Sequence, residues 1–97
     1  MPMRLQTTNV YLDWINSLAD RVVRARIQMR VDRLAHGNPG QYRNLSDGVS
    51  ELKIDVGPGY RVYYTERGGE LIVLLAGGDK STQQRDIKAA VARAKNL

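Results

Sequence analysis

The chain has 97 residues, a length typical of one domain, so we expect a single domain over residues 1–97. It contains no cysteine, which excludes disulfides and thiolate metal sites; no apolar run reaches the ~20 residues that span a bilayer, and no signal-peptide pattern opens the chain, so we expect a cytoplasmic protein. A net charge of +5, from 15 Lys and Arg against 10 Asp and Glu, favours a polyanionic partner, either nucleic acid or an acidic protein.

The first part of the chain is predicted to be helical after a brief strand at residues 4–7. Apolar residues recur with helical spacing in two consecutive stretches of residues 9–36. Thr8 or Asn9 is expected to cap the first helix and Asp20 the second, because their side-chain oxygens can accept hydrogen bonds from first-turn N–H groups. We therefore predict a helical hairpin.

The second of these helices is strongly basic. Residues 21–33 contain five arginines and one aspartate, a net charge of +4. Arg26, Arg30 and Arg33 fall on a different face from the apolar stripe of the same helix. An ordinary solvated helix surface explains such a face as well as a partner does.

A loop and three strands are predicted to follow. The loop spans residues 37–48, and we expect Tyr42 and Leu45 to attach it to the body of the protein. Residues 51–80 then form three strands joined by two turns marked by glycines. The third strand is apolar throughout, as in a strand covered on both sides, and Gly77-Gly78 is expected to end it.

The last helix is predicted to begin shortly after that strand. Asp79 or Ser81 is expected to cap it, with Ser81 and Gln84 spaced as in a capping box. Ile87, Val91 and Ala94 give it only a weak apolar stripe.

Alternation along the first two of the three strands assigns their faces. The core side is predicted to carry Leu52, Ile54, Val56, Tyr60, Val62 and Tyr64. Lys53, Arg61 and Tyr63 then share an opposite, exposed face, and Lys80 and Arg85 follow close to it. Cations beside an aromatic ring suit RNA phosphates and bases. The alternative is a solvated sheet face without a ligand.

The segment ELKIDVGPGYRVYY, followed by a hairpin, an apolar strand and GGDKSTQQRDI, resembles the RelE/ParE toxin superfamily of type II toxin–antitoxin systems. It is most similar to the HigB-like addiction module killer branch, and the resemblance covers nearly the whole chain. It implies an α+β fold, in which an N-terminal strand and a helical hairpin pack on a mostly antiparallel sheet with a C-terminal helix.

The resemblance also implies an activity. RelE and HigB types are metal-independent endoribonucleases without a cofactor that cut mRNA on the ribosome, where the ribose 2′-hydroxyl attacks the neighbouring phosphorus. The implied partners are a cognate antitoxin, mRNA on the ribosome, and operator DNA through the antitoxin complex. Two alternatives stay open on the same scaffold: a ParE-like inhibitor of DNA gyrase, and a degenerate protein that only binds its antitoxin.

Site residues follow from the resemblance by position. Arg61 matches the transition-state arginine, Lys53 the strand lysine, and Lys80 the basic position after the apolar strand. Glu51 and Asp55 flank Lys53 and favour its charged form, so we expect Lys53 to bind phosphate rather than act as the base. No Tyr, Trp or His follows residue 64, so Tyr63 is expected to stack on a base, with Arg85 as a further RNA contact.

Overall fold

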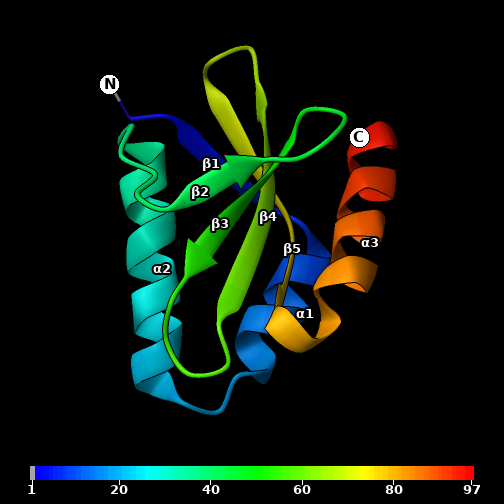
Figure 1. Ribbon diagram of the computed structural model, residues 1–97. Coiled ribbons are helices and arrows are strands. Elements are labelled where there is room, and N and C mark those ends of the chain that lie inside the picture. Colours follow the sequence, from blue (N-terminus) through cyan, green and yellow to red (C-terminus); the bar gives the residue numbers. More distant parts are fainter. Residues whose placement is uncertain (1) are drawn as a thin grey trace.

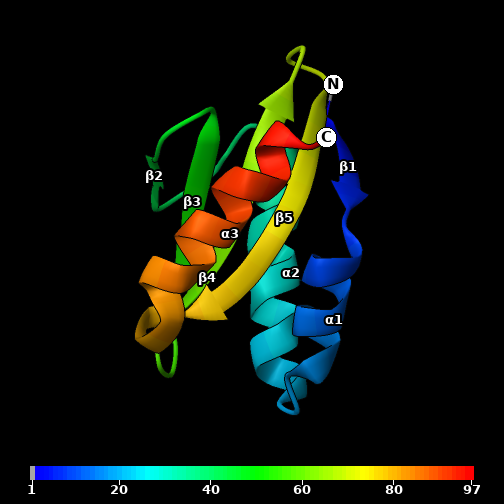
Figure 2. The same cartoon turned by 90° about the vertical axis from the view of Figure 1, so that its right-hand side faces the viewer.

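The computed structural model describes residues 2–97 and shows one sheet with helices on both of its faces (Figure 1 and Figure 2). The elements in chain order are β1 (Arg4–Thr7), α1 (Asn9–Ser17), α2 (Arg21–Ala35), β2 (Tyr42–Asn44), β3 (Val49–Ile54), β4 (Tyr60–Arg67), β5 (Leu71–Asp79), a 3-10 turn (Lys80–Thr82) and α3 (Gln83–Lys95). The strand order is β1-β5-β4-β3-β2, antiparallel except that β1 pairs in parallel with β5. The predicted α+β fold is confirmed. None of the helices within residues 2–97 has the length and apolar character needed to cross a membrane.

The predicted helical hairpin forms with the expected caps. The Thr8 hydroxyl oxygen accepts a hydrogen bond from the backbone N–H of Tyr11 at 3.2 Å, at the start of α1. The Asp20 carboxylate accepts from the N–H groups of Val22 and Val23, at the start of α2. After α2 the backbone turns at Gly37 with φ 86°, a left-handed conformation that glycine adopts without strain.

One face of the sheet packs against α1 and α2. Its buried residues come from both helices and from β3, β4 and β5: Tyr11, Ile15, Ile27, Val31, Leu34, Leu52, Ile54, Val62, Tyr64, Ile72 and Leu74. Because Leu52, Ile54 and Val62 all lie here, the predicted core side of β3 and β4 is confirmed.

The other face is covered by α3 (Figure 2). This cover agrees with the prediction that β5 is buried on both sides, whereas β3 and β4 were expected to be exposed on this face. A second buried cluster lies beneath this helix and contains Val49, Tyr63, Val73, Leu75, Ala76, Ala90 and Ala94. The small residues Ala90 and Ala94 let α3 approach the sheet closely, which a search for large apolar residues overlooks. The prediction that Tyr63 is exposed is therefore wrong, because its side chain is fully buried.

The predicted loop at residues 37–48 contains the short edge strand β2. It pairs antiparallel with β3, so that Arg43 lies opposite Glu51. Leu45 is partly buried against the second cluster, as expected, whereas Tyr42 is 48% exposed and does not anchor the segment.

Strand β5 runs through Gly77 and Gly78 instead of ending there. A Cβ atom at Gly77 would collide with the Trp14 ring, and one at Gly78 with the carboxylate of Asp86. These glycines thus permit close packing of helices on both faces rather than breaking the strand. Asp79 caps the 3-10 turn, because its carboxylate accepts from Ser81 N–H at 2.8 Å. The cap position of α3 itself is Thr82, which makes no side-chain capping bond, so the prediction that Asp79 or a Ser81–Gln84 capping box caps the last helix is wrong.

Candidate functional site

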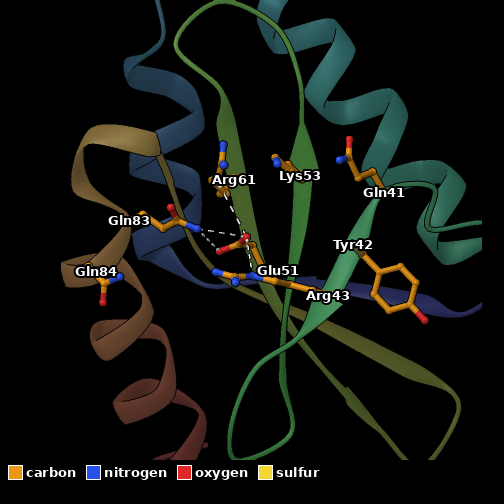
Figure 3. Close-up of a pocket in the computed structure, with 8 residues that line it drawn as sticks. All are labelled: Gln41, Tyr42, Arg43, Glu51, Lys53, Arg61, Gln83 and Gln84. Atoms are coloured by element: carbon orange, nitrogen blue, oxygen red, sulfur yellow. Dashed lines mark hydrogen bonds and ion pairs between the residues drawn. The ribbon is translucent and has the colours of Figure 1, made fainter.

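A pocket of about 490 Å³ opens between strands β2 to β4 and the start of α3 (Figure 3). Its lining residues are Gln41, Tyr42, Arg43, Glu51, Lys53, Arg61, Gln83 and Gln84. Three cations and one carboxylate among them leave a net charge of +2. The pocket therefore attracts anions.

Glu51 is the residue around which the pocket is built. Its side chain is 2% exposed and accepts hydrogen bonds from Arg43 Nε at 3.2 Å and from Gln83 Nε2 at 3.0 and 3.3 Å. Its Oε1 atom also lies 3.9 Å from Nε of Arg61, and the dashed lines of Figure 3 converge on this carboxylate. Glu51 thus joins β2, β4 and α3, so that it holds the cations in fixed positions.

Arg61 was also predicted to be exposed, but it is nearly buried, with 5% of its surface exposed, because α3 covers this face of the sheet. Its Nη1 donates to the carbonyl oxygen of Gly59 at 2.7 Å, while its Nε has no hydrogen-bond partner. Gly59 has φ 80°, and a Cβ atom there would lie 2.9 Å from Arg61 Nη1. The glycine therefore serves both the turn and the placement of this guanidinium group.

Lys53 faces Arg61 directly across the β3–β4 pair. The carbonyl oxygen of Lys53 accepts a hydrogen bond at 2.8 Å from Arg30 Nη1, which ties this strand to α2. Lys53 is half-buried and Arg43 is exposed, so both remain accessible to a ligand from solvent. The structure brings Lys53 and Arg61 together, as the sequence predicted.

Lys80 and Arg85 lie next to this pocket rather than in it. They line an adjoining depression of about 460 Å³ together with Ser81, Thr82, Gln83 and Gln84. Gln83 and Gln84 border both hollows, so an extended ligand could follow them from one to the other. Within residues 2–97, no three His, Cys, Asp or Glu side chains gather as metal ligands do.

Tyr63 cannot stack on a base from its position beneath α3. Its hydroxyl is buried without a hydrogen-bond partner, and burial raises the pKa of Tyr63, with the Glu51 and Asp86 charges adding to the effect. Tyr42 is the aromatic residue that lines the pocket. Sequence reasoning missed Tyr42 and Arg43 as site residues because β2 lies within a segment of loop composition.

Comparison with known proteins identifies the family of this chain. Residues 13–97 match the family described as "Phage derived protein Gp49-like". The chain belongs to this family. A Haemophilus influenzae protein (strain ATCC 51907 / DSM 11121 / KW20 / Rd) described as uncharacterized is 43% identical to this Gp49-like protein over 97 residues, covering 100% of this chain and 98% of the relative.

The fold of the Gp49-like protein is similar to that of a toxin of known structure. A mutant of the E. coli toxin RelE in the free state aligns with a TM-score of 0.67, at 16% identity, over 91% of this chain and 97% of the RelE chain. At this identity the likeness shows that the two proteins share a fold.

Proposed function

We propose that this Gp49-like protein is the toxin of a type II toxin–antitoxin system and that it cleaves mRNA on the ribosome without a metal ion. Its family and its RelE-like fold support a toxin, and the GPGYRVYY and GGDKS segments favour the HigB-like branch. The observation that carries the nuclease proposal is the facing pair of Lys53 and Arg61 in a pocket of net positive charge.

The reaction transfers a phosphoryl group within the RNA, from the 5′-oxygen of one nucleotide to the 2′-oxygen of its neighbour. The ribose 2′-oxygen attacks the neighbouring phosphorus and loses its proton, the bond to the 5′-oxygen breaks, and that oxygen gains a proton, leaving a cyclic phosphate. Arg61, preorganised by Gly59 and Glu51, stabilises the charge that develops on the phosphate oxygens, and Lys53 binds the same group.

Glu51 serves as a positioning residue in this proposal. Both of its carboxylate oxygens already accept hydrogen bonds from Gln83, and one of them also accepts from Arg43. Because these donors already occupy its oxygens, we do not assign Glu51 the role of the base. We therefore assign the missing acid–base groups to the ribosome, which accounts for the proposed ribosome dependence.

The rest of the site would hold the RNA strand. Tyr42 offers an exposed ring for stacking on a base, and Lys80 and Arg85 offer charges for the next phosphates in the adjoining depression. A cognate antitoxin would neutralise the protein, and the complex of the two would bind operator DNA.

The test is to sequence mRNA ends after brief expression of the chain in growing bacteria. We expect growth arrest and breaks phased with codons. The breaks should be lost in Lys53→Met, which keeps the apolar stem, and in Glu51→Gln/Arg61→Gln, which removes both buried charges together. Lys88→Met, an exposed lysine of α3 outside the pocket, is the matched control. Unchanged breaks in both pocket variants would refute the site.

Inhibition of DNA gyrase is the second candidate. The observation that favours it is that α3 (Gln83–Lys95) carries no aromatic residue to stack on RNA. Intact mRNA together with a DNA-damage response would support this candidate. Expression with no effect on growth would instead indicate a protein that only binds its antitoxin.

A further inference from the structure

A second pocket, of about 300 Å³, opens between the end of α2 and the edge strand β2, on the face of the sheet that packs against α1 and α2 (Figure 1). We call it the β2 pocket. Its walls include Leu34, Tyr42, Asn44, Ser50, Tyr64 and Glu66. The volume is at the lower end of the about 300–1,000 Å³ that is typical of small-molecule sites. The β2 pocket therefore has room for one small planar ligand.

The charge of the β2 pocket is opposite to that of the cationic pocket around Lys53 and Arg61. Among the described residues that line the β2 pocket, Glu66 alone is charged. Its side chain is exposed and takes part in none of the five ion pairs found among residues 2–97. A free carboxylate accepts hydrogen bonds from N–H groups and repels phosphate. The pocket therefore suits the N–H donors of a ligand rather than its phosphate.

Tyr42 borders both pockets. Its side chain is 48% exposed, and in Figure 3 the ring points away from Glu51. Tyr64, the other aromatic residue of the β2 pocket, is buried, so Tyr42 is the ring that a ligand can stack on. Because the two pockets meet at Tyr42, a base in the β2 pocket would lie next to the site proposed for phosphate.

Two further polar groups of the β2 pocket are fixed by each other. Asn44 and Ser50 are opposite one another in the β2–β3 pair, and Ser50 Oγ donates to Asn44 Oδ1 at 2.9 Å. This bond occupies the amide oxygen and leaves Asn44 Nδ2 as a donor. Together with Glu66, the pocket thus offers one N–H donor and one carboxylate acceptor to a ligand.

We propose that the β2 pocket binds a guanine base. The Watson–Crick edge of guanine carries the O6 acceptor beside two donors, N1–H and N2–H. Asn44 Nδ2 would donate to O6, the carboxylate of Glu66 would accept from both N–H groups, and the base would stack on Tyr42. The base would come either from an RNA strand whose phosphate lies in the cationic pocket or from a free guanine nucleotide. The proposal concerns binding and does not rest on ribonuclease activity.

The other bases fit these groups less well. Adenine and cytosine would direct the lone pair of a ring nitrogen at the Glu66 carboxylate, and uracil would direct two carbonyl oxygens at it around a single N–H. Each would leave a polar group without a partner, which costs free energy. An organic cation would pair with Glu66, but it would find only one exposed ring, that of Tyr42, and the cationic pocket beside it.

The first test is an NMR titration of the isotope-labelled full chain with GMP, AMP, CMP and UMP, which share their phosphate and differ in the base. We expect saturable shifts at Asn44, Ser50 and Glu66 with GMP, and binding about 10-fold tighter than that of the other three nucleotides, as hydrogen bonds to a charged group provide. Glu66→Gln should abolish this preference. Glu70→Gln, which removes an exposed carboxylate in the β4–β5 turn, is the matched control and should keep it.

The second test distinguishes the two sources of the base. Fluorescence anisotropy measures the affinity of the chain for a short oligouridine with and without one guanosine. If the base belongs to an RNA strand, the guanosine should raise the affinity about 10-fold in the wild type and not in Glu66→Gln. Binding of GMP without this gain would identify a free guanine nucleotide as the ligand.

Three outcomes would overturn the proposal. The first is the absence of a preference for guanine in both tests. The second is a preference that Glu66→Gln leaves unchanged, and the third is binding of choline to the β2 pocket as tightly as GMP, which would make it a cation site. Guanine-selective binding by a chain that cleaves no mRNA would support this proposal while the proposed nuclease failed. Codon-phased breaks without any guanine preference would do the reverse.

Discussion

The carboxylate of Glu51 and the guanidinium group of Arg61 form a buried ion pair, with Oε1 and Nε 3.9 Å apart and side chains 2% and 6% exposed. The pair spans neighbouring strands, and Gln83 adds hydrogen bonds from α3. The cationic pocket is thus fixed before any ligand arrives, which lowers the reorganisation needed to stabilise a developing negative charge.

Replacing Glu51 by alanine should strongly destabilise the fold. The Arg61 charge would remain buried without its counter-ion, a change that typically costs about 3–5 kcal/mol. The free energy of unfolding from urea titrations measures the effect. Arg43→Ala is the matched control, because Arg43 contacts the same carboxylate from an exposed position and should cost about 1 kcal/mol or less. Equal losses in the two variants would contradict the buried-pair interpretation.

Replacing Tyr63 by phenylalanine should not destabilise the protein at neutral pH. The Tyr63 hydroxyl is buried without a partner, so its removal is expected to be neutral or to stabilise by about 1 kcal/mol. A decrease of more than about 1 kcal/mol in the free energy of unfolding would instead show that the hydroxyl is hydrogen-bonded in solution.

The same variant should also change how stability depends on pH. Burial raises the pKa of Tyr63 in the folded state above the unfolded value of about 10. The stabilisation that follows from this raised pKa is therefore complete below about pH 10, and it is lost as the pH rises through the pKa of the folded state. The midpoint temperature of thermal unfolding can be measured from about pH 8 to about pH 11, on both sides of that value. It should fall less steeply with rising pH for Tyr63→Phe than for the wild type. Tyr11 and Tyr64, whose pKa values are also raised by burial, are present in both proteins, so the difference isolates Tyr63.

Adding a methyl group at Gly77 should destabilise the packing of α1 on β5. The new Cβ would meet the Trp14 ring, and such overpacking typically costs about 1–3 kcal/mol. The free energies of unfolding of Gly77→Ala, Trp14→Leu and the double variant measure the coupling between the two positions. We expect the double variant to lose less than the sum of the single losses, and additive losses would show that the ring moves aside freely.

Removing the Tyr42 ring should weaken RNA binding without affecting stability. The ring is 48% exposed at the pocket, and stacking on a base is worth about 1–3 kcal/mol, or about 5- to 150-fold in affinity. Fluorescence anisotropy with a short single-stranded RNA should show this loss for Tyr42→Ala and little change for Tyr42→Phe. Equal affinity of Tyr42→Ala and the wild type would exclude stacking by this ring.

Patterns that depend on local geometry were predictable from the sequence. Alternation correctly separated Leu52 and Val62 from Lys53 and Arg61, because neighbouring side chains of a strand must point to opposite faces. The caps of α1 and α2 were likewise predictable, since Thr8 and Asp20 act within one turn of their own helices.

Features that depend on distant contacts were not predictable in this way. The burial of Tyr63 depends on α3, whose alanines give little apolar signal. Strand β2 depends on pairing with β3, because its three residues have no strand pattern of their own. The continuation of β5 through Gly77 depends on the position of Trp14 in α1, far away in the chain.

The parallel pairing of β1 with β5 sets the order in which the protein can fold during its synthesis. Residues 4–7 leave the ribosome well before their partners at residues 71–74. The β3–β4 and β4–β5 hairpins close locally, whereas β1 must wait for a long loop to close. A nascent chain therefore carries α1 and α2 with their apolar stripes uncovered, and chaperones that bind such stripes would meet the protein before its sheet is complete.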